Sequence, residues 1–248
     1  MLPSELSVQL YTVREAIARD LASALARIAD LGFTKVELYD FVDRADKYAT
    51  LLGSLGLTAP SGHAMLMDSD PGPALDAARR LGLSTVIQPM VAAERWLDRE
   101  DVVGVARALN EVALAGADRG LQIGYHNHWW ELESRIDGVR ALEVFADHLD
   151  DGVVLEVDAF WAQVGGVEPA ELLSRLGERV RFIHVKDGPI TLDTTLQVPV
   201  GSGDVDIPAV LAAAPQALRV VELDDFGGDV FDALRDSITY LTVEYTGA

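Results

Sequence analysis

Residues 20–39 read DLASALARIADLGFTKVELY, and this stretch holds the pattern that decides the fold. Apolar side chains recur every three or four positions between Leu21 and Leu31, which is the spacing of an amphipathic helix. Gly32 follows directly, and glycine often ends a helix because it adopts the left-handed backbone conformation at little cost. The apolar run Lys35–Tyr39 then predicts a short strand. One helix followed by one strand is therefore encoded here.

The same order of helix, glycine and strand recurs along the chain, with further junctions at residues 55–57, 81–83 and 119–121. Eight candidate strands follow from it: Leu6–Tyr11, Lys35–Tyr39, Leu57–Gly62, Thr85–Gln88, Gln122–His126, Val153–Val157, Arg181–Val185 and Arg219–Leu223. Eight units in 248 residues average about 31 residues each, which is typical of the βα unit of a closed barrel. We therefore predict an α/β fold, a (β/α)8 TIM barrel.

The alternative architecture is a doubly wound open sheet. Its best sequence signal, G-x-G-x-x-G after the first strand, is missing, because residues 9–13 read QLYTV. No linker or low-complexity segment divides the sequence. We therefore expect a single barrel domain over residues 1–248.

The composition excludes several classes of protein. With 20 basic and 40 acidic residues, the formal net charge is −20, and such a chain repels nucleic acid backbones. The absence of cysteine excludes disulfides and thiolate sites and fits a reducing cytoplasm. The sequence has no run of about 18 apolar residues, so we expect no membrane span, and from its first residues we expect no targeting leader. A homo-oligomer is compatible with all of these features.

Chemistry in such barrels takes place at the carboxyl ends of the strands. Polar side chains stand at or just beyond most of the predicted ends: Gln9, Glu37, His63, His126, His128, Glu131, Asp158, His184, Lys186 and Glu222. The second half of the barrel supplies most of the carboxylates and imidazoles. We therefore expect the site at this rim.

Four of these residues offer the donor atoms of a divalent metal site: Glu131, Asp158, His184 and Glu222. Three carboxylates and one imidazole suit Mn²⁺, Co²⁺ or Zn²⁺, whereas Ca²⁺ prefers oxygen throughout. A single such carboxylate is equally typical of a helix N-cap or a solvated loop. Four groups crowded together without a cation, however, would repel one another or lose hydration. The set therefore predicts one bound ion.

Several stretches resemble a known family: Gln9–Arg14, Gly124–His128 with Glu131, Val157–Asp158 with Trp161, Ile183–Asp187, Val200–Asp206 and Val221–Glu222. They are similar to the Tyr-His-Asn-His subgroup of the sugar phosphate isomerase/epimerase family, within the xylose-isomerase-like TIM barrels. The resemblance implies one divalent ion, expected to be manganese, with zinc, cobalt or magnesium as alternatives. Carried over to this sequence, its ligands are Glu131, Asp158, His184 and Glu222.

The fifth strand end leaves an alternative open. Relatives often place a glutamate where this chain has His126, so His126 is the alternative ligand to Glu131. His126 and His128 otherwise serve as acid/base groups or orient a ligand. The sequence also departs from the subgroup at Trp129 and Trp130, whose rings can stack on a sugar.

A metal and acid/base groups together suit proton abstraction next to a carbonyl, through a metal-stabilised enediolate. Returning the proton gives an isomerase or an epimerase, for which Glu131 and Glu222 are the expected two-base pair. Expelling a β-oxygen instead gives the alternative, a dehydratase or lyase of keto-sugars or glycosides. Lys186 either holds an oxyanion or forms an ion pair. An endonuclease-like barrel and a non-catalytic sugar-binding protein are less favoured, the former because of the charge of −20.

The expected substrate is a small carbohydrate, contacted by Gln9, Glu37, His63, Trp129 and Trp161. For Glu37 the alternative is a structural ion pair, for His63 a hydrogen-bonded rim residue, and for Trp161 a place in the core. The loop at 200–206 carries two aspartates and no basic residue, which disfavours phosphate binding. We therefore expect a sugar without phosphate.

Overall fold

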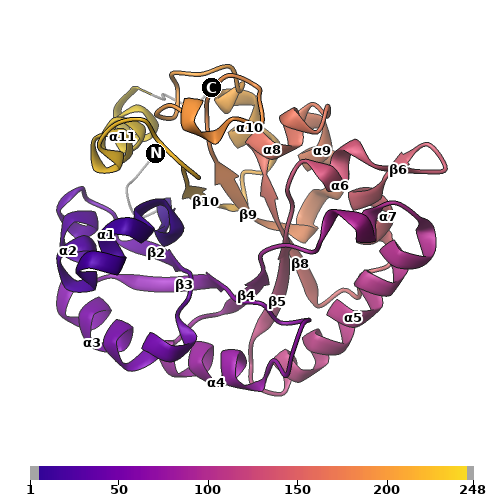
Figure 1. The fold of residues 1–248 in the computed structure, drawn as a ribbon, viewed down its shortest axis with the longest axis horizontal. Helices are drawn as coiled ribbons and strands as arrows, with labels where there is room; N and C mark the ends of the chain where they lie inside the picture. Colours follow the sequence, from indigo (N-terminus) through magenta and orange to yellow (C-terminus); the bar gives the residue numbers. More distant parts are fainter. Residues whose placement is uncertain (1–5, 245–248) are drawn as a thin grey trace.

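Eight parallel strands close into a barrel in the computed structural model, which describes residues 6–244 (Figure 1). The strands are β1 (Leu6–Gln9), β2 (Lys35–Leu38), β3 (Thr58–His63), β4 (Thr85–Gln88), β5 (Gln122–His126), β8 (Val153–Asp158), β9 (Val180–Val185) and β10 (Leu218–Val221). Strand β1 closes the barrel by pairing with both β2 and β10. The predicted TIM barrel is confirmed.

Helices form the outer ring around the strands (Figure 1). The longer ones are α2 (Leu21–Asp30), α3 (Ala45–Leu55), α4 (Gly72–Leu81), α5 (Arg99–Ala117), α7 (Ala141–Asp147), α9 (Pro169–Leu176), α10 (Ile207–Ala213) and α11 (Val230–Thr239). Short helices follow three strands: α1 (Arg14–Arg19), α6 (Trp130–Glu133) and α8 (Ala159–Val164). Within residues 6–244, no helix has the length and apolarity needed to cross a membrane.

Two glycines end helices where the sequence predicts an end. Helices α3 and α4 stop at Gly56 and Gly82, whose φ angles are 67° and 75°. Other residues rarely adopt this left-handed conformation, because their Cβ atoms clash with the backbone. The chain therefore turns at these glycines from the outer ring back into the barrel.

The barrel interior is layered, because alternate side chains of each strand point inward. One layer below the polar groups lies a separate buried cluster that we call the apolar plug: Ile87, Val154, Phe182 and Val220. Gly124 leaves room for it, since a Cβ there would lie 3.1 Å from Ile87 Cγ1 and 3.3 Å from Val154 Cγ2. Two residues further along β8, β9 and β10 the inward positions turn polar: Glu156, His184 and Glu222. The polar groups therefore gather at the mouth.

Two local features differ from the prediction. The first strand ends at Gln9 rather than Tyr11, because the Gln9 side chain accepts a hydrogen bond from the Tyr11 amide and begins a 3₁₀ helix over Leu10–Val13. A two-stranded hairpin, β6 (Arg135–Ile136) and β7 (Val139–Arg140), lies outside the barrel. Its strands are too short to produce the alternation that identifies a strand in a sequence.

Candidate active site

Polar side chains from six strands or their following loops are buried at the barrel mouth: Gln9, Glu37, His126, Glu156, Asp158, His184, Lys186 and Glu222. Burying charged groups costs free energy unless they have partners. Five of these residues, together with the partly buried His63, form two groups of potential metal ligands, and in each group the ligand atoms all lie within 4.8 Å of one another. We call Asp158, His184 and Glu222 the outer cluster, and His63, His126, Glu156 and His184 the inner cluster.

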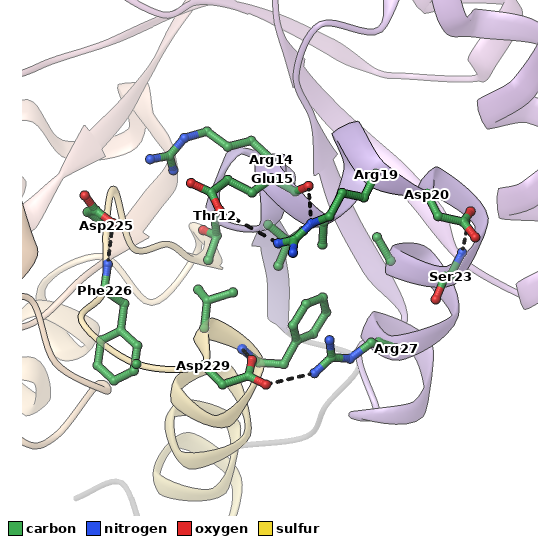
Figure 2. Close-up of a pocket in the computed structure, with 16 residues that line it drawn as sticks. Thr12, Arg14, Glu15, Arg19, Asp20, Ser23, Arg27, Asp225, Phe226 and Asp229 are labelled. Atoms are coloured by element: carbon green, nitrogen blue, oxygen red, sulfur yellow. Dashed lines mark hydrogen bonds and ion pairs between the residues drawn. The ribbon is translucent and has the colours of Figure 1, made fainter.

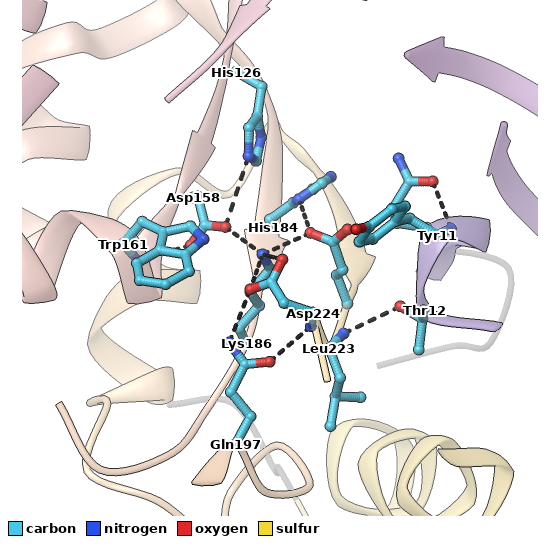
Figure 3. Close-up of polar contacts among 12 residues, drawn as sticks. Tyr11, Thr12, His126, Asp158, Trp161, His184, Lys186, Gln197, Leu223 and Asp224 are labelled. Carbon is cyan, nitrogen blue, oxygen red and sulfur yellow. Dashed lines mark hydrogen bonds and ion pairs between the residues drawn. The ribbon is translucent and has the colours of Figure 1, made fainter. Parts of the chain in front are cut away.

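The outer cluster brings together three of the four predicted metal ligands. Asp158 ends β8, His184 lies near the end of β9, and Glu222 directly follows β10. His184 Nδ1 lies 2.7 Å from Glu222 Oε2. Figure 3 shows the side chains of Asp158 and His184 pointing toward the same point.

Two donor atoms of the outer cluster are suited to a cation. Asp158 Oδ2 and His184 Nδ1 are buried and have no hydrogen-bond partner among the described residues. The close approach of Glu222 to His184 Nδ1 is an ion-pair contact without hydrogen-bond geometry. On the other side of the ring, His184 Nε2 lies 2.7 Å from Glu37 Oε1, so a neutral ring that donates its Nε2–H to Glu37 would leave the Nδ1 lone pair for a cation. The residues present therefore fit a divalent metal.

Lys186 places a fixed positive charge beside the outer cluster (Figure 3). Its Nζ lies 2.9 Å from Asp158 Oδ2, 2.7 Å from Glu222 Oε2 and 2.9 Å from both carboxylate oxygens of Asp224. Burial lowers the pKa of Lys186, but these carboxylates raise it well above its ordinary value. When His184 is neutral, as a metal-bound imidazole is, three carboxylates and one ammonium leave an excess of two negative charges, which matches a divalent cation.

The pKa of Asp158 reflects its burial. Burial raises it to about 6, although the charges of Lys186 and His184 lower it. A carboxyl group that is only partly ionised near neutral pH would be fully ionised beside a cation. A bound metal would therefore keep the Asp158 carboxyl group ionised, as a ligand must be.

The inner cluster is centred on Glu156. Its Oε2 lies 2.6 Å from His63 Nε2, 3.1 Å from His126 Nδ1 and 3.1 Å from His184 Nε2. Burial lowers the pKa of His63, but Glu37 and Glu156 raise it to about 9. Burial and the neighbouring charge of His184 hold the pKa of His126 well below its ordinary range. Two histidines of one cluster thus differ in charge at neutral pH.

Glu131 lies in neither cluster. It is fully buried in the short helix α6, where Oε1 accepts a hydrogen bond from the Tyr125 hydroxyl at 2.7 Å and Oε2 accepts one from the His128 amide at 2.9 Å. Both oxygens are therefore occupied by the protein. The structure does not bring Glu131 together with Asp158, His184 and Glu222, and the alternative ligand His126 approaches Asp158 Oδ2 to 3.8 Å.

His128 faces the mouth from the loop after β5. Its ring stacks on Trp130 with a centroid separation of 4.4 Å and an interplanar angle of 6°. Burial, followed by the charge of Lys186, lowers the pKa of His128 to about 3. The ring is therefore neutral at physiological pH.

A cavity of about 580 Å³ opens above the clusters. His63, His126, His128, Glu222 and Asp224 form its polar side. Of the predicted substrate contacts, only His63 lines this cavity: Gln9 and Glu37 lie below it and are hydrogen-bonded to each other at 2.8 Å. Trp129 packs on the core and on Trp130, and Trp161 lies beside Lys186.

A second cavity, of about 500 Å³, lies between the segment after β1 and the amino end of α11 (Figure 2). Three arginines reach it, but each has a partner. Arg19 pairs with Glu15, Arg27 pairs with Asp229, and Arg14 donates to the Asp224 carbonyl. Carboxylates thus offset the charges of Arg19 and Arg27, whereas backbone carbonyls hold the Arg14 guanidinium in place.

Sequence reasoning did not assign a site role to Glu156 or Asp224. Each lies two residues from an assigned residue, Asp158 and Glu222 respectively. Glu156 and Asp158 share the inward face of β8, because side chains repeat every second residue along a strand. Extending the set by this period would have found Glu156.

Comparisons with known proteins agree with this architecture. The family model for xylose isomerase-like TIM barrels matches residues 25–217. A solved sugar phosphate isomerase/epimerase from Parabacteroides distasonis is 23% identical, with a TM-score of 0.83 over 97% of this chain and 94% of that one. No curated protein sequence matches this chain.

More distant structures share the fold. The probable 3-DHS dehydratase AsbF from Bacillus anthracis is 12% identical, with a TM-score of 0.73 over 96% of this chain and 98% of that one. The IOLI protein, solved with a bound zinc atom, is 15% identical, with a TM-score of 0.75 over 98% and 99%. On the strength of the barrel and the family match, this chain belongs to the xylose isomerase-like TIM barrel family.

Proposed function

We propose that this protein is a divalent-metal-dependent isomerase or epimerase that acts on a small sugar or keto-sugar. The outer cluster carries the proposal: three buried donor groups converge, two of their donor atoms form ion-pair contacts but no hydrogen bond among the described residues, and Glu222 opens the group to the cavity. The family match and the sugar isomerase/epimerase named among similar structures support a carbohydrate as substrate.

Asp158, His184 and Glu222 would hold the ion. A bound divalent cation supplies Lewis-acid polarisation of a carbonyl and its neighbouring hydroxyl. We expect manganese, because mixed imidazole and carboxylate donors suit it, with zinc, cobalt and magnesium as alternatives. Lys186 positions the carboxylates of Asp158 and Glu222 through its ion pairs.

Two histidines of the cavity lining differ in charge at neutral pH. His63 has a pKa of about 9 and is protonated at neutral pH, whereas His128 has a pKa of about 3 and is neutral. We assign Glu222, which lines the cavity, as the proton acceptor and His63 as the donor to a substrate oxygen, with the neutral His128 ring as a hydrogen-bonding group, because a pKa of about 3 makes it a weak base.

Solvent exchange tests the activity. Manganese-loaded protein incubated with keto-sugars in D2O should replace one carbon-bound hydrogen by deuterium without loss of water, as followed by NMR. Loss of water instead would indicate a lyase. Absence of exchange with every sugar in a metal-loaded protein would contradict the proposal.

Metal analysis tests the ligands. We expect Asp158→Asn and His184→Ala to lower bound metal while the barrel stays folded by circular dichroism. Asp151→Asn and His148→Ala, at exposed positions, are the matched controls and should keep the metal. If both cluster variants retain full metal, the ligand set is wrong.

A further inference from the structure

The main cavity has two unlike sides. Its polar side faces the clusters, and its other side is built by apolar and aromatic residues that the proposed function leaves unexplained: Tyr11, Tyr39, Phe41, Met65, Pro89 and Met90. We call these six residues the apolar wall. The hydroxyl groups of a sugar would use the polar side, and the proposed function assigns no part of the ligand to the apolar wall.

Three large side chains of the apolar wall are exposed to solvent rather than buried in the core. Tyr11, Met65 and Met90 are 41%, 46% and 40% exposed. They come from three different loops, after β1, β3 and β4. Large apolar side chains that converge from separate loops on one cavity mark a surface that an apolar ligand covers.

The apolar wall is held in place from behind. Gln88, buried at the end of β4, accepts a hydrogen bond from the Leu66 amide at 2.7 Å and donates one to the Met90 carbonyl at 2.7 Å. One side chain thus fixes both methionine-bearing loops. The rings of Tyr11 and Tyr39 meet edge to face at 5.6 Å. A preformed wall of this kind lowers the entropy lost on binding.

The described residues that line this cavity include the acidic Asp40, Glu222 and Asp224 but no lysine or arginine. The Arg14 guanidinium lies 4.3 Å from the Tyr11 ring centroid and donates to two backbone carbonyls, those of Tyr11 and Asp224. Asp40 forms an ion pair with Arg44 at 3.1 Å. The wall therefore favours a neutral group over a phosphate or a carboxylate.

We propose that the sugar bound at the clusters carries a neutral aromatic substituent, which packs on the apolar wall. The substrate class is thus an aryl-substituted keto-sugar rather than a free monosaccharide. A flat ring suits this surface, because tyrosine edges and methionine thioethers both make favourable contacts with aromatic faces. The cavity of about 580 Å³ has room for a sugar and a ring together. This inference rests on the proposed function for the sugar half of the ligand.

Calorimetric titration of the metal-loaded protein with phenyl and methyl glucosides, in both anomeric forms, tests the inference. We expect one phenyl glucoside to bind at least about tenfold more tightly than its methyl counterpart, from burial of the ring. Met65→Ser and Met90→Ser should each reduce this preference severalfold. Leu114→Ser, at an exposed leucine on α5, is the matched control and should leave it unchanged.

The outcomes separate this inference from the proposed function. Equal affinity for phenyl and methyl glucosides, or no binding of either, overturns the aromatic substituent even if deuterium exchange with simple keto-sugars succeeds. A phenyl preference that survives both methionine variants, in proteins folded by circular dichroism, also overturns it. A phenyl preference lost in both variants supports it even if no sugar exchanges.

Discussion

Glu131 is a buried carboxyl group whose hydrogen bonds help to hold the loop after β5 at the barrel mouth. Its oxygens accept hydrogen bonds from the Tyr125 hydroxyl and the His128 amide, so it ties the end of β5 to the loop that carries His128. Burial raises the pKa of Glu131 from 4.5 to about 8, despite the hydrogen bond from Tyr125. The folded protein therefore holds a proton here that the unfolded chain releases.

Replacing Glu131 by glutamine should change how stability depends on pH. The folded-state pKa of this acid is raised, so its contribution reduces wild-type stability as pH rises from about 4.5 to about 8. Glu131→Gln removes the ionisable group and with it this loss of stability. The unfolding free energy of the variant minus that of wild type should therefore rise by roughly 3–5 kcal/mol as pH increases from about 4.5 to about 8. Urea unfolding at several pH values in EDTA measures it.

The same variant tests the ligand role that the sequence assigned to Glu131. Because both of its oxygens contact the protein, Glu131→Gln should keep its metal by elemental analysis. A loss as large as that of Asp158→Asn would instead place Glu131 in the metal site.

Lys186 balances the carboxylates of the outer cluster. Lys186→Met would leave Asp158, Glu222 and Asp224 without this ammonium, and removing one partner of a buried charge cluster typically costs about 3–5 kcal/mol. We expect a large fall in the melting temperature in EDTA and a partial recovery with manganese. Lys47→Met, on the exposed face of α3, should change neither value. An unchanged Lys186→Met melt in EDTA would contradict this charge balance.

At the scale of single elements, packing between strands sets the interior layers. Gly124 of β5 faces Ile87 and Val154, so Gly124→Ala should overpack the apolar plug and cost about 1–3 kcal/mol of unfolding free energy. Gly152 has open space where its Cβ would lie, which makes Gly152→Ala the control. Guanidinium unfolding of both variants compares them. Equal stability would mean that β4 and β8 shift apart freely.

Most of the strands were predictable because a glycine lies shortly before them, and β1 and β10 were found from their apolar residues alone. Asp158, His184 and Glu222 were predictable as a set because each lies at or next to a strand end, where the barrel fixes its position. Glu131 lies five residues beyond β5, and the helix α6 turns its side chain into the core. That turn depends on Tyr125 and on packing, which a linear pattern does not contain. The apolar wall was not predicted either, because its residues belong to separate loops.

At the scale of the whole molecule, a bound metal should stabilise the closed barrel against unfolding. The outer cluster joins β8, β9 and the end of β10, so an ion bound there links the last three strands of the barrel. A ligand that binds only the folded state at 100 times its dissociation constant adds about 2.7 kcal/mol of stability. Manganese should raise the unfolding free energy of wild type but not of Asp158→Asn, as measured by urea unfolding. Equal shifts in both proteins would place the ion elsewhere.

The side chains of the apolar plug fill the barrel interior below the two clusters. Ile87 and Val220 have no exposed surface, and Val154 and Phe182 retain 4% and 6%. Ions and sugars would then reach the clusters only from the cavity at the barrel mouth. A sugar bound in that cavity would block the exit of the ion. A chelator should therefore remove metal more slowly from the sugar-bound protein than from the free protein.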